Sequence, residues 1–253
     1  MALPPRRQLH FGLQLTPVVK WLLIVLVGIW VLTSILVRTV KLGAADTAFN
    51  ELALTPPAVM HGHVWQLLSY AWLHDIADLA HILFNGFALV LLGPELERRW
   101  GRRAFIKFYL LTGLFAGVFS VLAGLVAAPL YNVSIVGASG AIFGLVAAWS
   151  MLFPQRELLL LFVIPVRVKW LVWIAIAGDF VVLALNGQTD TAIQCHIGGA
   201  LTGWFLITGN WHPRVFVPRL RLLFRRRTPP ARRTYLNSSA TSLTPATRSA
   251  KPA

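Results

Sequence analysis

The sequence predicts an all-α, polytopic membrane protein with six transmembrane helices. The chain has 253 residues, of which 57% are hydrophobic and 13% are charged, and its mean hydropathy is +0.67. A soluble domain averages about 45–50% apolar and about 25% charged residues. The composition therefore excludes a soluble globular enzyme, because too few polar side chains are present to cover a surface that faces water.

The first apolar segment, residues 18–37, is long enough to cross a bilayer, since ~20 apolar helical residues span ~30 Å of hydrocarbon. It exceeds the ~7–15 residues of a signal-peptide core. Arg38 and Lys41 also separate it from the small residues that could form a cleavage site, so we expect a retained helix. The other five predicted spans are residues 79–92, 105–126, 139–153, 168–185 and 192–207.

The basic residues predict the orientation, because Lys and Arg collect on the cytoplasmic side of a membrane. Of the 23 Lys and Arg residues, 21 lie near the N-terminus, between spans two and three, between spans four and five, or after span six. Only Arg38 and Lys41 lie on the opposite side. We therefore expect both termini in the cytoplasm and the loop of residues 38–78 outside. No Arg- and Ser-rich transit peptide is seen, so we expect a bacterial cytoplasmic membrane as the location. This placement accounts for the net charge of +14 without nucleic-acid binding.

Three regions follow from these spans. Residues 1–17 form a cytoplasmic segment, residues 18–209 form the membrane domain, and residues 210–253 form a basic tail. The tail has too few apolar residues for a core, so we expect it to be disordered and to lie against anionic lipid. The single cysteine, Cys195, excludes an internal disulfide.

Polar side chains within the spans are the candidates for function, because they are costly inside a bilayer. Span two begins with His81 and Asn85, whose i,i+4 spacing places them on one helix face. Span four begins with Ser139, followed by Phe143, and span six begins near His196. These three spans run in the same direction, so their first residues are expected at a similar depth near the outer face.

Small residues predict that spans four and six approach closely. Gly140 and Gly144 recur at i,i+4, and so do Gly199 and Gly203. Stripes of this kind allow the backbones of transmembrane helices to meet. Such an approach is what a hydrogen bond between Ser139 and the imidazole of span six would require.

That hydrogen bond would activate Ser139 as a nucleophile, with His196 accepting its proton. Backbone N–H groups at the start of span four could stabilise an oxyanion, and His81 and Asn85 could add donors. Each residue also has a structural alternative: Ser139 as a helix N-cap, His196 bonded to a carbonyl, Phe143 as a lipid contact, Asn85 as a bridge between helices, and the glycines as packing alone. Four polar residues at one depth on three helices favour the functional interpretation.

The pattern resembles the rhomboid family of intramembrane serine proteases between about residues 51 and 209. Four motifs carry the resemblance, in the order found in the family: the HxxxN pair (His81, Asn85), the ExxxG turn (Glu97, Gly101), the GxSG nucleophile motif (Gly137, Ser139, Gly140) and the helix of the catalytic histidine (His196, Gly199, Gly203).

The resemblance implies a rhomboid-like bundle in which Ser139 and His196 form a catalytic dyad that needs no cofactor. Many bacterial members have a tyrosine where Phe143 stands, and a Phe ring can likewise stack on the imidazole. The family often has Trp-Arg in its first outer loop, where this chain has Trp65-Gln66. The implied substrates are transmembrane proteins cut near the outer boundary of their helices.

Three points remain open from the sequence. No pattern positions Asp179, in the middle of span five, or Asp190, in a loop, as a third member of the dyad. A catalytically silent relative that binds and guides membrane clients is the alternative function, and retention of both Ser and His disfavours it. A metal site would need the histidines before and within span two (His61, His63, His74, His81); we expect none, because no ligand pattern joins them.

Overall fold

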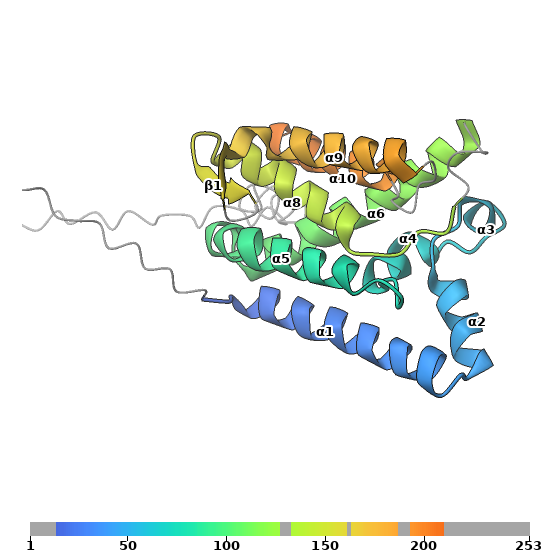
Figure 1. The fold of residues 1–253 in the computed structure, drawn as a ribbon. Coiled ribbons are helices and arrows are strands. Elements are labelled where there is room, and N and C mark those ends of the chain that lie inside the picture. The colour runs from blue at the N-terminus through green and yellow to red at the C-terminus, as the bar shows by residue number, and fades with distance from the viewer. Residues whose placement is uncertain (1–13, 127–132, 161–162, 187–192, 210–253) are drawn as a thin grey trace, which may run out of the picture.

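A computed structural model describes residues 14–126, 133–160, 163–186 and 193–209 (Figure 1). Most of the predicted N-terminal segment, the whole basic tail, Asp190 and parts of both short outer connections lie outside the described residues.

The described chain is mostly helical, and its long helices coincide with the predicted spans. Helix α1 (Pro17–Ser34) continues into a π-helical turn (Ile35–Thr39). The other long helices are α5 (Leu79–Trp100), α6 (Arg102–Val126), α8 (Ser139–Leu152), α9 (Leu171–Asn186, preceded by the 3₁₀ turn Val168–Trp170) and α10 (Ile193–Thr208). Helix α5 runs past the predicted end at residue 92 and through Pro94, because helical hydrogen bonding does not stop where the apolar run stops.

By length and hydropathy, four helices of the described chain could cross a membrane: Pro17–Thr39, Leu79–Trp100, Arg102–Val126 and Val168–Leu185. Helix α8 has only 14 residues and α10 has 16. These two short helices are the enclosed ones, since nine of the 14 residues of α8 and eight of the 16 residues of α10 are buried. The more peripheral α9 has 6% of its apolar window buried.

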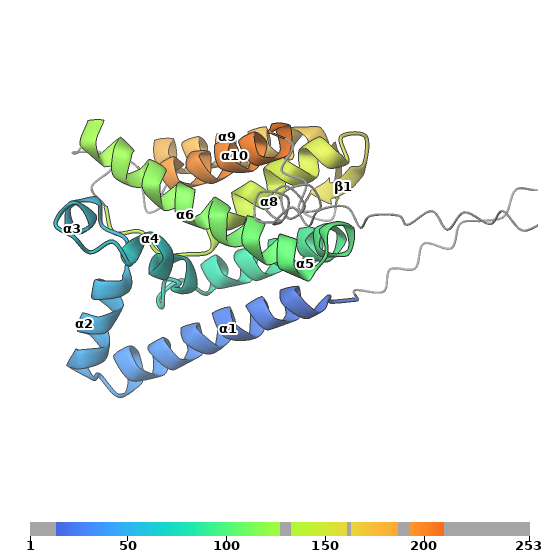
Figure 2. The ribbon, with the colours of Figure 1, turned by 180° about the vertical axis from the view of Figure 1, so that it is seen from behind.

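Helices α6, α8 and α10 pack against one another, and α1 lies at the edge of the bundle against α5 (Figures 1 and 2). The beginning of α1 and strand β1 lie at one end of the bundle, and α2 and α3 lie at the other (Figure 1). Helix α8 leads into β1, so Ser139, its first residue, lies toward the end that carries α2 and α3.

The connection between α8 and α9 contains two short strands that the all-α prediction did not include. Strands β1 (Glu157–Leu160) and β2 (Ile164–Arg167) form an antiparallel hairpin there, with Glu157 opposite Arg167. The chain reverses direction within a few residues at this point, so its backbone N–H and C=O groups pair with each other rather than along a helix.

The predicted outer loop is largely helical. It contains α2 (Gly43–Leu52), α3 (Pro56–Met60), α4 (Gln66–Ser69) and a 3₁₀ turn (Tyr70–Trp72). The side chain of Gln66 anchors it: the buried amide accepts a hydrogen bond from the Thr55 N–H (3.0 Å) and donates one to the Glu51 carbonyl (3.1 Å). Trp65 donates a second hydrogen bond to that carbonyl (3.0 Å). Glutamine therefore anchors this loop where the resembled family often has arginine.

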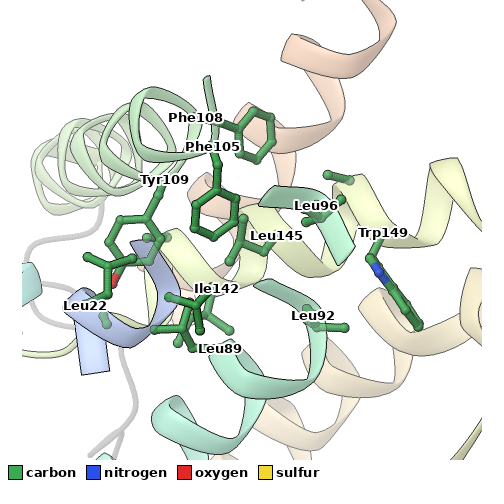
Figure 3. Close-up of a cluster of buried hydrophobic side chains, with 14 of the residues drawn as sticks. Leu22, Leu89, Leu92, Leu96, Phe105, Phe108, Tyr109, Ile142, Leu145 and Trp149 are labelled. Carbon is green, nitrogen blue, oxygen red and sulfur yellow. The ribbon is translucent and has the colours of Figure 1, made fainter. Parts of the chain in front are cut away.

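A cluster of large apolar side chains joins α1, α5, α6 and α8 (Figure 3). Inside a bilayer the hydrophobic effect contributes little to contacts between helices, because the lipid tails are as apolar as the side chains. The close fit of the side chains therefore holds these helices together. The labelled members are Leu22, Leu89, Leu92, Leu96, Phe105, Phe108, Tyr109, Ile142, Leu145 and Trp149.

The Glu97–Gly101 motif joins α5 to α1. Gly101 ends α5 at a φ of +83°, which favours glycine. The buried carboxylate of Glu97 accepts hydrogen bonds from the backbone N–H groups of Val18 and Val19, each at 3.1 Å. The first N–H groups of a helix have no partner within the helix. By accepting from these donors, Glu97 fixes the beginning of α1 to the end of α5.

Candidate active site

Ser139 and His196 lie within hydrogen-bond distance of each other. The Ser139 hydroxyl is 2.8 Å from Nε2 of His196, although the two residues are 57 positions apart. Ser139 is the first residue of α8, and the N-cap position is taken by Ala138, with no side-chain capping bond. The N-cap alternative for Ser139 therefore has no support in the geometry.

The glycines of α10 make this distance possible. A Cβ atom added to Gly199 would overlap the carbonyl oxygen of Gly140, and one added to Gly203 would lie 2.5 Å from the carbonyl oxygen of Gly144. The two backbones are thus in direct contact. Gly144 itself points elsewhere, because a Cβ there would meet Thr112 of α6 at 2.5 Å. The absence of a side chain at Gly144 therefore allows both α6 and α10 to approach α8 closely.

Phe143 lies on the imidazole of His196. The two ring centroids are 4.1 Å apart and the ring planes differ by 8°, which is a stacked arrangement. Phe143 is one helical turn after Ser139 on α8. The helix that carries the Ser139 hydroxyl therefore also restricts the imidazole of His196, through the Phe143 ring. The imidazole can then rotate little, because only 8% of its side chain is exposed.

His81 and Asn85 stand one turn apart on α5, and the His81 ring lies beside the turn that precedes Ser139. The Asn85 amide is buried and donates to the His81 carbonyl (2.9 Å), which fixes the Asn85 side chain along its own helix. A Cβ atom on Gly137 would lie 2.6 Å from Nε2 of His81 and 3.7 Å from the Ser139 hydroxyl. Gly137 also has a φ of +124°. Any other residue would be strained there and would displace the His81 imidazole.

His74 was not identified from the sequence as part of this site. It is fully buried beneath the turn, its ring lies edge-on to His81 with centroids 5.1 Å apart, and its Nε2 accepts from the Ala138 N–H at 3.5 Å. Burial, with the neighbouring His81, lowers the pKa of His74 to about 3. His74 is therefore neutral near pH 7 and keeps a lone pair for the backbone next to Ser139.

Asp179 is the second residue that sequence reasoning missed. Its carboxylate Oδ2 is 2.7 Å from Nδ1 of His196, and only 13% of its side chain is exposed. Its position in the middle of a predicted span could have indicated it, because an ionisable residue inside an apolar transmembrane helix is a candidate functional residue. The sequence does not show which neighbouring helix Asp179 faces, because that depends on the rotation of α9 about its axis.

The loop histidines that were considered as metal ligands contact other groups in the structure. Within the described ranges, no group of three or more His, Cys, Asp or Glu side chains could hold a metal ion. His63 instead lies 3.4 Å from Glu51 and stacks on Trp65 in the outer loop, and His61 bonds to the Pro57 carbonyl.

The arrangement has the parts that acyl transfer requires. A hydroxyl faces a ring nitrogen, and the ring is held by stacking and by a second hydrogen bond. The hydroxyl also belongs to the first residue of α8, and the first backbone N–H groups of a helix have no partner within it.

The Rhomboid domain family model matches residues 61–212 of this chain, a range that contains all of these side chains. The chain is similar to YdcA of Bacillus subtilis, with 31% identity over 145 residues, which is 57% of this chain and 67% of the relative. It is 33% identical over 176 residues to RHOMBOID-like protein 2 of Arabidopsis thaliana, covering 65% of this chain and 48% of the relative.

Rhomboid protease GluP of Bacillus subtilis is 29% identical over 165 residues, covering 65% of this chain and 30% of the relative. The last two relatives are thus matched over about half of their length or less, while the family model covers more than half of this chain. These matches confirm the resemblance found in the motifs. The chain belongs to the rhomboid family.

Proposed function

We propose that this protein is an intramembrane serine protease that cleaves peptide bonds in the transmembrane segments of other membrane proteins. The observation that carries the proposal is the 2.8 Å contact between the Ser139 hydroxyl and Nε2 of His196. Membership of the rhomboid family supports it, since relatives in the family carry the name protease.

The reaction follows from the positions of the side chains. Ser139 attacks the carbonyl carbon of the scissile bond while His196 accepts the hydroxyl proton and then gives it to the leaving amine. The oxyanion is stabilised by the Ser139 backbone N–H, with His81 and Asn85 as further donors from α5. Water then hydrolyses the acyl-enzyme, with His196 acting first as base and then as acid.

The membrane setting determines the substrate class. We propose six spans, with α8 and α10 as the short inner ones, cytoplasmic termini, and a bacterial cytoplasmic membrane. The site then lies a short way below the outer surface. A transmembrane substrate must break its helical hydrogen bonds before Ser139 can reach the backbone, so residues that destabilise a helix near the cut should favour cleavage.

The test is covalent labelling of the purified full chain in detergent with a fluorophosphonate probe, beside the Ser139→Ala variant. Labelling of the wild type, together with cleavage of a model transmembrane substrate, is expected, and Ser139→Ala should show neither. A wild-type chain that binds membrane clients without labelling or cleavage would favour the silent client-guiding alternative.

A further inference from the structure

We propose that Asp179 is a positioning residue that makes this site a Ser–His–Asp triad rather than a dyad. This inference rests on the proposed protease function. Its structural basis is independent of that function, because Oδ2 of Asp179 lies 2.7 Å from Nδ1 of His196, on the opposite side of the ring from the Ser139 hydroxyl.

The position of Asp179 argues against an incidental contact. It is the one charged residue in α9, a helix otherwise composed of apolar side chains, glycine and the terminal Asn186. It stands seven residues before the end of α9, or ~10 Å along the axis. A carboxylate at such a depth is costly unless it is paired. The imidazole of His196 supplies the partner.

The contact determines which nitrogen of His196 carries the proton. An ionised carboxylate has only acceptor sites, so the hydrogen bond at 2.7 Å requires a proton on Nδ1. Nε2 then carries the lone pair that faces Ser139. This tautomer is the one in which the imidazole can act as a base, whereas the other tautomer would present an N–H to the hydroxyl.

The carboxylate also balances the charge during the reaction. The Ser139 proton moves to Nε2 as the bond between Oγ and the carbonyl carbon forms and the carbonyl electron pair moves to its oxygen. The imidazole becomes an imidazolium ion, and its Nδ1 proton stays on Nδ1. Asp179, whose side chain is 13% exposed, stabilises this cation within a region of low dielectric constant. Asp179 itself touches no reacting atom.

The distinguishing experiment compares Asp179→Asn with the wild type and with Asp46→Asn, a matched change on the exposed first turn of α2. The Asn side chain has nearly the same size, but its amide can donate to Nδ1 and so can stabilise the wrong tautomer. We expect kcat for a model transmembrane substrate to fall by about 10²–10⁴-fold. KM and the thermal unfolding midpoint should remain close to the wild-type values, and Asp46→Asn should match the wild type.

Nitrogen-15 NMR of labelled histidine supplies a readout independent of cleavage. The His196 signals, identified by their loss in His196→Gln, should show the proton on Nδ1 in the wild type and on Nε2 in Asp179→Asn. A wild-type His196 with its proton on Nε2 would overturn the inference even if the variant did not fold. Unchanged kcat in Asp179→Asn, or a loss explained by unfolding or by KM alone, would also overturn it.

The two proposals fail in different ways. If the wild type is neither labelled by the fluorophosphonate nor active, the protease function fails, while the tautomer measurement still reports on the pairing of Asp179 and His196. If the wild type is labelled and active and Asp179→Asn is equally active, only the triad fails.

Discussion

Among the described residues, the Ser139 hydroxyl pairs with His196, and the imidazole is itself held from three directions. Phe143 stacks on the imidazole, Asp179 binds its Nδ1, and the backbone of α10 is pressed against α8. Ala138 occupies the N-cap position of α8, and the hydroxyl of Ser139 is directed to His196 instead. Its removal should therefore affect the chemistry much more than the fold.

Removing either member of the Ser–His pair should disable the same step. Ser139→Ala, His196→Ala and the double variant should each lose activity by a similar factor, on the order of 10⁴-fold or more, rather than by factors that multiply. Single-turnover cleavage of a model transmembrane substrate measures this.

Thermal unfolding provides the control for that comparison. Loss of a true N-cap costs ~1 kcal/mol, and Ser139→Ala should cost less, because the cap position belongs to Ala138. Multiplicative losses would show that the two residues act in separate steps, and robust cleavage by Ser139→Ala would remove it as the nucleophile.

At the scale of the helices, contact between the backbones of α8 and α10 decides whether the site can form. Gly199 contacts Gly140 and Gly203 contacts Gly144, with no room for a side chain at either position of α10. The distance between the Ser139 hydroxyl and Nε2 of His196 is therefore a property of the helix pair. Under the proposed function, a residue that never touches substrate should be able to abolish activity by separating the helices.

The smallest possible test is Gly199→Ala, since its single added methyl group would meet the Gly140 carbonyl. Overpacking of this kind costs about 1–3 kcal/mol, and widening the contact between Ser139 and His196 should remove most of the cleavage activity. Cleavage rate and unfolding midpoint are the measurements.

Gly28→Ala is the matched control, because a Cβ atom at Gly28 on α1 has no heavy atom within 4 Å. It should keep full activity and lose no stability, since alanine favours a helix over glycine by about 1 kcal/mol. Equal activity in both variants would mean that the site does not depend on the close approach of α8 and α10.

At the scale of the whole molecule, the two ends of the bundle differ in chemistry. One end carries the start of α1 and the β-hairpin (Figure 1), with Arg98, Arg99, Arg156 and Arg167 nearby. The other end carries α2, α3 and the anchored outer loop. A bilayer protein with this asymmetry should place the basic end in the cytoplasm.

Cysteine labelling tests this orientation, because the natural Cys195 is buried and should not react. Met60→Cys in α3 and Val163→Cys in the hairpin introduce thiols at positions that are 57% and 76% exposed. In intact cells a membrane-impermeant maleimide should label Met60→Cys at once and Val163→Cys only after permeabilisation. The reverse order would invert the topology and would place Ser139 near the cytoplasm.

The sequence by itself predicted the long helices and their order along the chain, and both agree with the structure. Helix formation and bilayer insertion depend on runs of apolar residues in one segment. The predicted direction of each span follows from its number in the order of spans, because successive spans alternate in direction. The shared depth of His81, Asn85, Ser139 and His196 is a prediction that follows from those directions. The GxxxG spacing likewise identified α8 and α10 as close neighbours, because small-residue stripes are a property of a single helix face.

Only the tertiary structure decided which side chains face each other. Asp179 meets His196 because α9 turns that face toward α10, His74 lies under Ala138 because the outer loop folds back, and Gln66 ties the same loop to Glu51. The rotation of a helix about its axis depends on the packing of every neighbour. The hairpin between α8 and α9 was also hidden, since an apolar run of about ten residues satisfies strand and helix patterns equally. The antiparallel pairing of β1 with β2 resolves this choice, with Glu157 opposite Arg167.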